Sequence, residues 1–386
     1  MRNIVIASRD SLDPITTSPY MAENDRKMHY HDYLHIDQIL SAQVLESEKA
    51  GRKPAHEEML FIIIHQTYEL WFKQIIHELS SVVRMFNVKE VDERNIGVAT
   101  GRLRRVIEIQ EVLVSQVRVL ETMTSLDFLE FRSYLFPASG FQSFQFRQIE
   151  AMMGLEEEHR LRYGPKPYHT QLHSDQAGEI QDLEDADSLF ECMENWLERT
   201  PFLHLGDFEF LKYYKQAVED MIAQEKKFIQ VSTMDQDEKD RHIAMLEANS
   251  GYYEMVLDES KHAEMQASGQ VRLSYKASMA ALLIHLYRDE PILHGPFNFL
   301  SCLKDMDEMF TTWRYRHAQM VLRMIGRKVG TGGSSGHDYL RNAASQHQVF
   351  KDLYNISTLL IPRSSLPPLP TEIKQQLGFY FTSTDV

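Results

Sequence analysis

The order of hydrophobic and polar positions predicts helices along most of the chain. Residues 53–86 begin with Pro54 and two acidic residues and then contain helix-forming residues without further glycine or proline, which predicts one long helix. A second long helix is expected over residues 93–122, because apolar residues recur there close to every 3.6 positions. These apolar residues are Leu103, Val106, Ile107, Ile109, Val112, Leu113 and Val117.

Shorter helical patterns fill most of the remaining sequence. They cover residues 123–135, which Pro137 stops, residues 144–155, a helix that ends at 196–201, and the segments 275–286, 300–325 and 336–360. Residues 207–265 combine alternating charges with Met, Ile and Leu at helical spacing, which predicts a solvent-exposed helical pair. Residues 1–28 predict an irregular, partly flexible arm, and the charged residues 156–187 predict a loop or peripheral insertion.

These patterns together predict an all-α fold. No alternating strand pattern extends beyond a few residues, and no segment repeats at a fixed period. We therefore expect residues 29–386 to form one helical-bundle domain with an inserted helical hairpin at about 205–265. The length of 386 residues and the hydrophobic content of 43% are sufficient for a sizeable core.

Charge and cysteine content narrow the possible partners and compartments. Lys and Arg number 41 against 56 Asp and Glu, and the net charge of −15 argues against a protein that coats nucleic acid or an anionic membrane. The two cysteines, Cys192 and Cys302, cannot make a disulfide framework, which favours a reducing compartment. No stretch approaches the roughly 20 apolar residues of a membrane span, and the N-terminus has too short an apolar run for a signal peptide. We expect a cytoplasmic protein.

A glycine-rich segment with five glycines, residues 326–336, raises the question of phosphate binding. A phosphate-binding P-loop needs a lysine after its glycines and a preceding strand, but here no lysine follows and a helix precedes. Two interpretations remain open. The segment is either a flexible connector between helices or a loop whose backbone approaches a ligand, with Thr331, Ser334 and Ser335 supplying hydroxyls.

His317 lies in an apolar helical pattern, one turn after Trp313. A histidine in such a stripe is most often packed in a core, but an imidazole in a Met-rich apolar helix also suits axial haem ligation. Nearby cations would then face carboxylates such as haem propionates. These cations are Arg314, Arg316, Arg323 and Arg327.

Two further polar residues lie among aromatic side chains. His65 shares a helical face with Phe61, Tyr68 and Phe72, so it is either hydrogen-bonded in the core or exposed to a cavity. Arg132 shares a face with Phe128 and Leu135. An arginine in this setting either clamps a carboxylate of a ligand or pairs with one of the chain's many acids.

A di-iron carboxylate bundle is the competing metal site. Its ExxH pairing occurs twice, at Glu156 to His159 and at Glu259 to His262. Both pairs lie in strongly charged, poorly amphipathic segments, so we interpret them as solvated charge.

Several blocks of the chain together resemble the tryptophan 2,3-dioxygenase family. They run in order from about residue 30 to residue 367: YHDYLHIDQIL, HEEMLFIIIHQTYELWFKQI, LETMTSLDFLEFRSYLFPASGFQSFQFR, WLERTP, WRYRHAQMVLRMIGRKVGTGGSSG and NISTLLIPR. The longer chain is similar to the animal-type form. The resemblance implies a cytoplasmic homotetramer, a dimer of dimers with one haem b per subunit. It also implies cleavage of the indole C2–C3 bond of L-tryptophan by O₂ to N-formyl-L-kynurenine, the first step of the kynurenine pathway.

The resemblance also implies roles for individual residues. His317 matches the proximal haem ligand and His65 the distal histidine that accepts from the indole N–H. Arg132 matches the arginine that binds the substrate carboxylate, and Thr331 a loop threonine near the ammonium group. The remaining matches are Phe61, Phe128 and Leu135 in the indole pocket, Ser139 and Trp313 beside the haem, and Tyr30 and Tyr33 reaching in from a neighbouring subunit.

The chain departs from the family pattern at three positions, and other activities stay open. His31 stands where the family commonly has Gly, Thr67 where animal forms usually have Ala, and Arg316 where they often have Asn. None of these changes removes a proposed ligand. The alternatives are a monooxygenase acting on a substituted tryptophan and a haem or tryptophan sensor without turnover.

Overall fold

The computed structural model of the chain describes residues 28–155, 172, 174–200, 203–205, 208–328 and 336–377. It divides into two compact units, residues 1–45 and residues 46–386. The described part of the first unit contains the short helices α1 (Tyr30–Tyr33) and α2 (Ile36–Leu40), neither of which has a buried residue. The second unit contains all the other elements.

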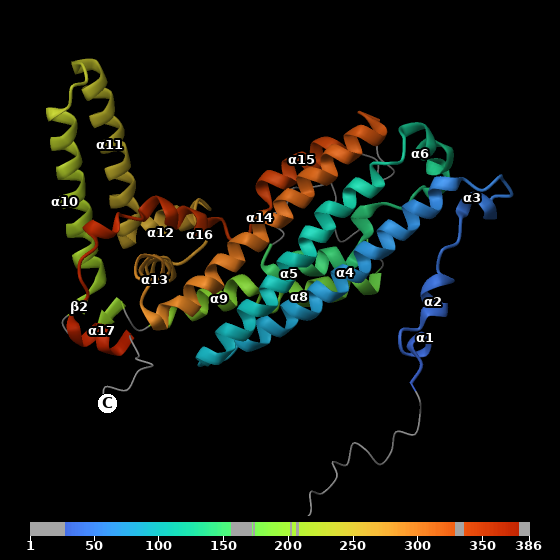
Figure 1. Cartoon of the computed structure of the whole chain (residues 1–386), viewed down its shortest axis with the longest axis horizontal. Coiled ribbons are helices and arrows are strands. Elements are labelled where there is room, and N and C mark those ends of the chain that lie inside the picture. The colour runs from blue at the N-terminus through green and yellow to red at the C-terminus, as the bar shows by residue number, and fades with distance from the viewer. Residues whose placement is uncertain are drawn as a thin grey trace, which may run out of the picture. The chain divides into compact units, whose positions relative to one another are not determined.

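Three long helices form the frame of the second unit: α4 (His56–Phe86), α5 (Glu93–Leu120) and α14 (Pro291–Ile325). Asp92 caps α5 by accepting a hydrogen bond from the Arg94 N–H, and Pro291 opens α14 where its missing N–H is harmless. The α5 helix packs against both α4 and α14, and the three run side by side (Figure 1). Most of the apolar residues that follow the predicted helical periodicity lie on the buried faces of these helices.

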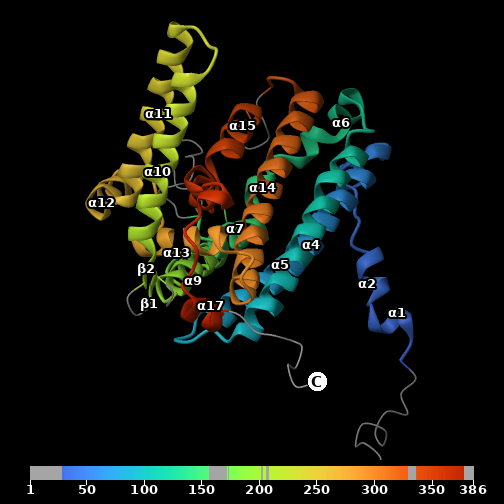
Figure 2. The same ribbon diagram turned by 60° about the vertical axis from the view of Figure 1, so that its left-hand side comes forward.

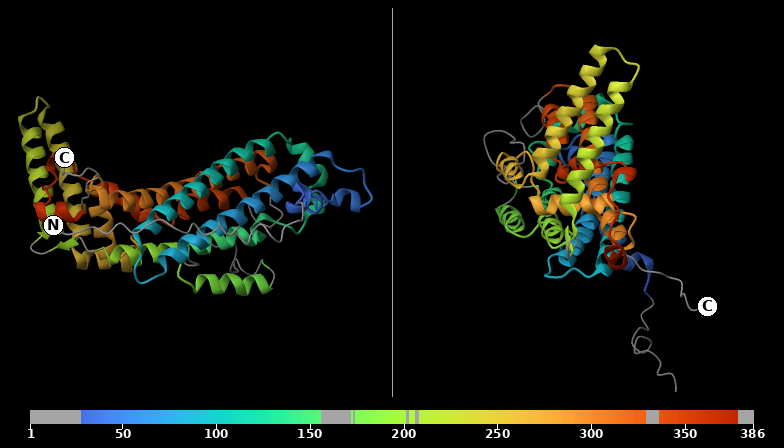
Figure 3. Two further views of the ribbon diagram at one scale, coloured as in Figure 1. Left: turned by 60° about the horizontal axis from the view of Figure 1, so that its bottom comes forward. Right: turned by 90° about the vertical axis from the view of Figure 1, so that its left-hand side faces the viewer.

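Shorter elements complete the second unit. They are α3 (Glu46–Lys49), α6 (Ser125–Phe131), η2 (Arg132–Leu135), η3 (Gly140–Gln142), α7 (Phe144–Met153), α8 (Ser174–Glu184), α9 (Leu189–Glu198), α12 (Glu259–Ala267), α13 (Tyr275–Leu286), α15 (Gly336–Gln346), α16 (Lys351–Asn355), η7 (Ile356–Leu359), η8 (Arg363–Ser365) and α17 (Thr371–Leu377). Figure 3 shows their arrangement around the long helices from two further sides.

A helical hairpin stands at one end of the second unit. It consists of α10 (Phe210–Val231) and α11 (Gln236–Leu257), which pack against each other and project beyond α13 (Figure 2). A two-stranded antiparallel ribbon of β1 (His204–Leu205) and β2 (Phe208–Glu209) precedes it. The all-α fold with its hairpin is therefore confirmed.

The buried apolar side chains of the second unit form two clusters. The larger follows the middle of the frame and extends to α9, α13 and α17. The smaller lies where α4, α5 and α14 meet α6, and it is built from Ala55, Ile64, Val117, Leu120, Met123, Phe131, Met320 and Met324. Burial of each large side chain contributes roughly 1.5–3 kcal/mol, so this smaller cluster fixes α6 firmly against the long helices.

Three sequence expectations need correction. Within the segment 156–187, expected to be a loop or peripheral insertion, residues 174–184 form the helix α8, so the loop alternative is wrong there. The helix α14 begins at Pro291, because proline is tolerated in a first helical turn and tertiary packing carries the helix past Pro296. The helix expected over 336–360 is broken, since the buried Asp307 carboxylate accepts the N–H groups of Val349 and Phe350 at 3.2 and 3.0 Å and ends the helical hydrogen bonding there. Of the predicted arm, residues 1–27 lie outside the described residues.

Within the described ranges, no helix has the length and apolar character needed to cross a bilayer.

Candidate functional site

A cavity opens among α4, α6, α7, α14 and α15 of the second unit. Seven of the residues predicted from the sequence line it: Phe61, His65, Phe128, Arg132, Ser139, Trp313 and His317. They come from segments up to 256 residues apart, since Phe61 and His317 are its outermost members. The fold therefore gathers into one space side chains that the sequence could only present separately.

His65 lines this cavity with a defined tautomer. It lies four residues after Phe61 on α4, and its Nδ1 is 2.7 Å from the Phe61 carbonyl oxygen. A carbonyl oxygen only accepts, so Nδ1 carries the hydrogen and Nε2 of the neutral ring is left as an acceptor. Burial lowers the pKa of His65, although the Phe61 hydrogen bond and the Glu69 charge oppose this effect. At neutral pH the ring offers an acceptor rather than a charge.

Aromatic rings form one wall of the cavity. The Phe61 ring lies 4.1 Å from the His65 ring and 5.7 Å from the Phe128 ring, measured between centroids. Behind them is Phe131, which is fully buried and packs edge-on against Phe61 at 5.6 Å and Phe128 at 5.4 Å. Such a wall suits a flat apolar group. Sequence reasoning missed Phe131, although its place three residues after Phe128 on a helix is a usable signal.

Arg132 and Ser139 lie where α6 gives way to 3-10 helices. Arg132 is the residue after α6 and begins η2, so in the sequence it comes directly after Phe131 of the aromatic wall. The hydroxyl of Ser125 donates to the Arg323 carbonyl at 2.9 Å and ties the start of α6 to the end of α14. Ser139 caps η3 by accepting from the Phe141 N–H at 3.4 Å. These hydrogen bonds fix the segment that carries Arg132 and Ser139 beside the cavity.

His317 faces the cavity from α14. Its ring stacks on Trp313, one turn earlier, with centroids 5.4 Å apart and planes inclined by 22°. Trp313 in turn contacts Phe146 at 5.0 Å and Tyr68 at 6.0 Å, which fixes the imidazole by packing. Burial lowers the pKa of His317 to about 4, with the nearby His65 as a second cause. The imidazole is therefore neutral at pH 7, the form that binds a metal.

The donors at this cavity fit a haem better than a bare metal ion. In the part of the chain that the structure describes, no group of three or more His, Cys, Asp or Glu side chains is placed to hold a metal. A porphyrin supplies four nitrogen ligands of its own, so one neutral imidazole is sufficient. The wall around His317 is apolar, as a macrocycle requires, and contains Met320, Val321, Met324 and Ile325.

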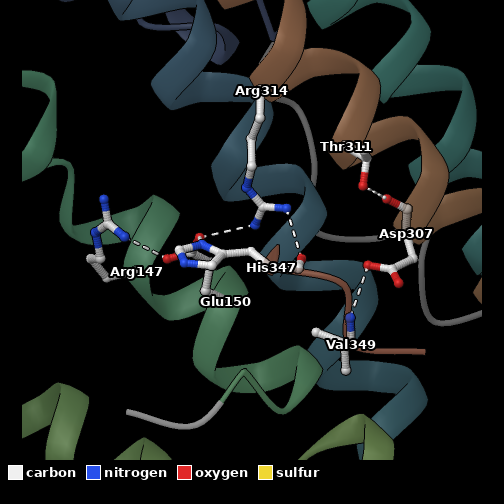
Figure 4. Close-up of polar contacts among 7 residues, drawn as sticks. All are labelled: Arg147, Glu150, Asp307, Thr311, Arg314, His347 and Val349. Carbon is white, nitrogen blue, oxygen red and sulfur yellow. Dashed lines mark hydrogen bonds and ion pairs between the residues drawn. The ribbon is translucent and has the colours of Figure 1, made fainter. Parts of the chain in front are cut away.

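Three charged residues lie in the wall of the same cavity: Arg147, Glu150 and Arg314 (Figure 4). We name them the ionic cluster. Glu150 accepts from Arg147 at 2.6 Å and from Arg314 at 2.9 Å. Arg314 also donates to the His347 carbonyl at 3.0 Å, and the Nδ1 of His347 lies 3.7 Å from Glu150. The sequence pointed to Arg314 as a cation facing a carboxylate, but it missed Glu150, whose partners Arg314 and His347 lie far away in the chain. Arg316 faces away and pairs with Glu121 at 3.0 Å.

The other predicted site residues lie elsewhere. Leu135 packs against the smaller apolar cluster and does not appear in the cavity wall. Tyr30 and Tyr33 belong to the first unit and are 73% and 66% exposed. Thr331 lies outside the described residues.

The remaining positions singled out in the sequence have local roles. His31 lies 3.5 Å from Asp37, and the Thr67 hydroxyl donates to the Ile63 carbonyl at 2.7 Å. His262 is buried with Nε2 2.9 Å from the Leu273 carbonyl, so its interpretation as solvated charge was wrong. Its short helix packs against α13, and this contact overrides the charged local pattern. Glu156 and His159 lie outside the described residues.

Comparison with known proteins gives one consistent match. The family model described as tryptophan 2,3-dioxygenase matches residues 17–360. A tryptophan 2,3-dioxygenase of Bdellovibrio bacteriovorus is 48% identical over 355 residues, which cover 92% of this chain and 99% of the relative. That of Dictyostelium discoideum is 47% identical, with 91% and 88% covered. The tryptophan 2,3-dioxygenase B of Danio rerio is 44% identical, with 89% and 84% covered.

Proposed function

The chain belongs to the tryptophan 2,3-dioxygenase family, and we propose that it cleaves the indole C2–C3 bond of L-tryptophan with O₂ to give N-formyl-L-kynurenine. Both oxygen atoms enter the product, so no further reductant is needed. One observation carries the proposal: His65, Arg132 and His317, on three separate elements, line a single cavity. The product would be the first intermediate of tryptophan degradation by the kynurenine pathway.

We propose haem b as the cofactor, one per subunit, with His317 as its axial ligand. Bound ferrous haem would supply the activation of O₂. The neutral imidazole, held by the stack on Trp313, offers a nitrogen lone pair without a proton to displace. Ser139 would lie beside the edge of the cofactor.

The polar and aromatic residues of the cavity would orient the substrate. Arg132 can donate two parallel hydrogen bonds to the carboxylate of tryptophan, and Phe61 and Phe128 would flank the indole. The free Nε2 of His65 would accept from the indole N–H. Indole N–H is too weak an acid to require a base for this chemistry, so the role of His65 is to position the ring against O₂.

Three more contacts are proposed from the family resemblance. Thr331 would bind the ammonium group from the glycine-rich segment, and Leu135 would extend the indole pocket. Tyr30 and Tyr33, exposed on α1, would enter the cavity of a neighbouring subunit in a homotetramer, a dimer of dimers.

An apolar stripe on the long helices supports assembly into an oligomer. It consists of exposed residues of the adjacent helices α4 and α5: Ile63, Leu70, Val112 and Val119. A groove lined by Leu70, Trp71, Ile109 and Val112, and on its polar side by Arg105 and Glu108, adjoins this surface. Exposed apolar surface of this kind is typical of an interface between subunits.

We further propose a cytoplasmic location, since both cysteines are free thiols in the interior, as in proteins of reducing compartments.

A labelling experiment tests the function. The protein is reconstituted with haem, reduced, and given L-tryptophan and ¹⁸O₂, and the product is analysed by mass spectrometry. Two ¹⁸O atoms in N-formylkynurenine are expected. A single labelled atom would support the monooxygenase alternative, and a Soret band that shifts with tryptophan without product would support a sensor. A protein that binds iron without a Soret band would refute the haem assignment.

A further inference from the structure

Glu69 ties two helices together beside the cavity. It lies one turn after His65 on α4, and its carboxylate accepts from the Ser143 hydroxyl at 2.6 Å and from the Gln145 side-chain amide at 2.8 Å. The Gln145 amide also donates to the backbone carbonyl of Glu69 at 2.8 Å. These bonds attach the start of α7 to the helix that carries His65.

The segment that ends at Ser143 is a single compact turn, which we name the η3 segment (residues 139–143). The Ser139 N–H donates to the Gln142 side chain at 3.1 Å, one of the two bonds of a capping box. The Ser143 N–H donates to the Gly140 carbonyl at 3.1 Å. Because both ends of the turn are hydrogen-bonded in this way, a displacement of Ser143 carries Ser139 with it.

The η3 segment forms part of the cavity wall. Ser139, Gly140 and Phe141 line the cavity together with His65. Glu69 does not appear in the wall, so it acts on the cavity through the residues that it holds or through its charge. The charge does reach the wall, since burial lowers the pKa of His65 and the Glu69 charge opposes this effect. A test must therefore separate position from charge.

We propose that Glu69 is a positioning residue of this cavity, which holds the η3 segment at a fixed distance from His65 through Ser143 and Gln145. The inference rests on the proposed function, in which Ser139 lies beside the cofactor and His65 contacts the indole. The space between these two side chains then stays fitted to the bound cofactor and substrate. A wall that is held in place before binding reduces the ordering cost of binding.

Two substitutions of Glu69 separate position from charge. Glu69→Ala removes the acceptor of both side chains, whereas Glu69→Gln removes the charge but keeps one oxygen for the Ser143 hydroxyl. In Glu69→Ala the dissociation constant of L-tryptophan, read from the shift of the Soret band, should rise about fivefold, the factor that one net hydrogen bond contributes. Glu69→Gln should restore most of the affinity.

The infrared C–O stretching band of the ferrous carbon monoxide complex is the second measurement, and it needs no turnover. It should broaden in Glu69→Ala, because the wall beside the cofactor then takes up several positions, and narrow again in Glu69→Gln. Ser143→Ala should resemble Glu69→Ala in both measurements. If Glu69→Ala does not fold, Ser143→Ala and Glu69→Gln must still differ in this way.

Glu198→Ala and Ser274→Ala are the matched controls. Glu198 accepts from the Ser274 hydroxyl at 2.6 Å, and Ser274 caps α13 by accepting from the Ala277 N–H at 3.2 Å. Ser143 caps α7 in the same manner, by accepting from the N–H of the residue three positions later at 3.3 Å. Neither control residue lines the cavity, so both variants should keep the original affinity and the original C–O band.

The outcomes separate this inference from the proposed function. If Glu69→Gln behaves like Glu69→Ala, the charge acts and not the position, and the inference fails while the dioxygenase proposal stands. Changes no larger than those of Glu198→Ala would also overturn it. The expected changes, with no N-formylkynurenine formed by the original protein, would support the positioning role and refute the activity. A protein without a Soret band after reconstitution would refute both.

Discussion

The Nδ1 atom of His65 lies 2.7 Å from the carbonyl oxygen of Phe61, its neighbour one turn earlier on α4. This bond uses one ring nitrogen as a donor and leaves Nε2 as an acceptor at the cavity. The same contact holds the His65 ring at 4.1 Å from the Phe61 ring, which belongs to the aromatic wall. One backbone carbonyl thus fixes both the tautomer and the position of the group that would bind the indole N–H.

His65→Ala should retain haem but lose orientation of the substrate. Loss of one hydrogen bond, roughly 1 kcal/mol, is expected to raise KM for L-tryptophan about fivefold or more. The discriminating measurement is kcat/KM with 1-methyltryptophan, whose indole nitrogen has no hydrogen. The original protein should disfavour this analogue relative to tryptophan, and the variant should not. An unchanged ratio would argue against contact between His65 and the indole nitrogen.

His317→Ala should lose most of its haem. No other imidazole in the described cavity wall stacks on Trp313 as His317 does, so the iron would lose its axial ligand. The Soret absorbance per protein after reconstitution and gel filtration measures this loss, and added free imidazole should restore part of it. His65→Ala serves as the control and should stay loaded. Stoichiometric haem in His317→Ala would contradict the ligand assignment.

Phe131→Leu should broaden the range of accepted indoles. Phe131 is fully buried behind Phe61 and Phe128, so a smaller side chain gives both rings room to retreat. Relative kcat/KM for ring-substituted tryptophans against tryptophan is expected to rise several-fold, and the free energy of unfolding to fall by about 1–2 kcal/mol.

Phe299→Leu is the control for this variant. Phe299 is equally buried but stacks on Phe86 at 4.4 Å in the larger cluster, outside the cavity wall. Phe299→Leu should lower the free energy of unfolding by a similar amount without altering the selectivity among indole substrates. Equal selectivity in the two variants would show that Phe131 acts only as a core residue.

The helices were predictable where the signals lie within the segment itself. The helix α13 was predicted with its observed bounds, and α4 and α5 within three residues at either end. The apolar periodicity of α5 and the first-turn residues of α4 are such local signals. The break after α15 was not predictable. Its cause is the Asp307 carboxylate, which the chain brings near Val349 only after folding.

Prediction of the site was limited in the same way, because its contacts join residues that lie far apart in the sequence. Patterns around His65 and His317 each allowed a core role and the pattern around Arg132 allowed an ion pair, and the resemblance of whole blocks favoured a ligand role. The ionic cluster shows what local patterns omit: Glu150 and Arg314 are 164 residues apart, and neither neighbourhood indicates the other. Charged residues predicted to face solvent or a ligand can be paired in the interior when the fold supplies a partner from a distant helix.

The lowered pKa of His285 should make the folded protein less stable in acid. It is buried on α13, its Nδ1 lies 2.7 Å from the Ala281 carbonyl, and burial lowers its pKa to about 4. Between pH 6.5 and 4 the unfolded chain binds the proton more strongly than the folded protein, so the free energy of unfolding falls as the pH falls through this window. From pH 7 to pH 5 this one group accounts for about 2 kcal/mol.

Denaturant unfolding of the original protein and of His285→Gln at pH 7 and pH 5 isolates this contribution. Other histidines with a lowered pKa, such as His65 and His347, act in the same direction and remain in both proteins. The difference between the two proteins should therefore shrink as the pH falls. A constant difference would mean that His285 is already protonated in the folded protein or does not titrate in this range.

Leu70→Glu should dissociate the proposed homotetramer. Leu70 is 57% exposed on α4 within the apolar stripe, beside the groove formed by Trp71, Ile109 and Val112. Arg105, a cation of the same groove, already pairs with Glu78 at 2.8 Å, so in an interface the added carboxylate would lose its hydration and compete for that pair, which costs several kcal/mol at each contact. Size-exclusion chromatography with light scattering should show a species smaller than the tetramer. Val231→Glu, at an 81% exposed position at the end of α10, should keep the original mass. If Leu70→Glu leaves the mass unchanged, the stripe is not the surface through which the subunits associate.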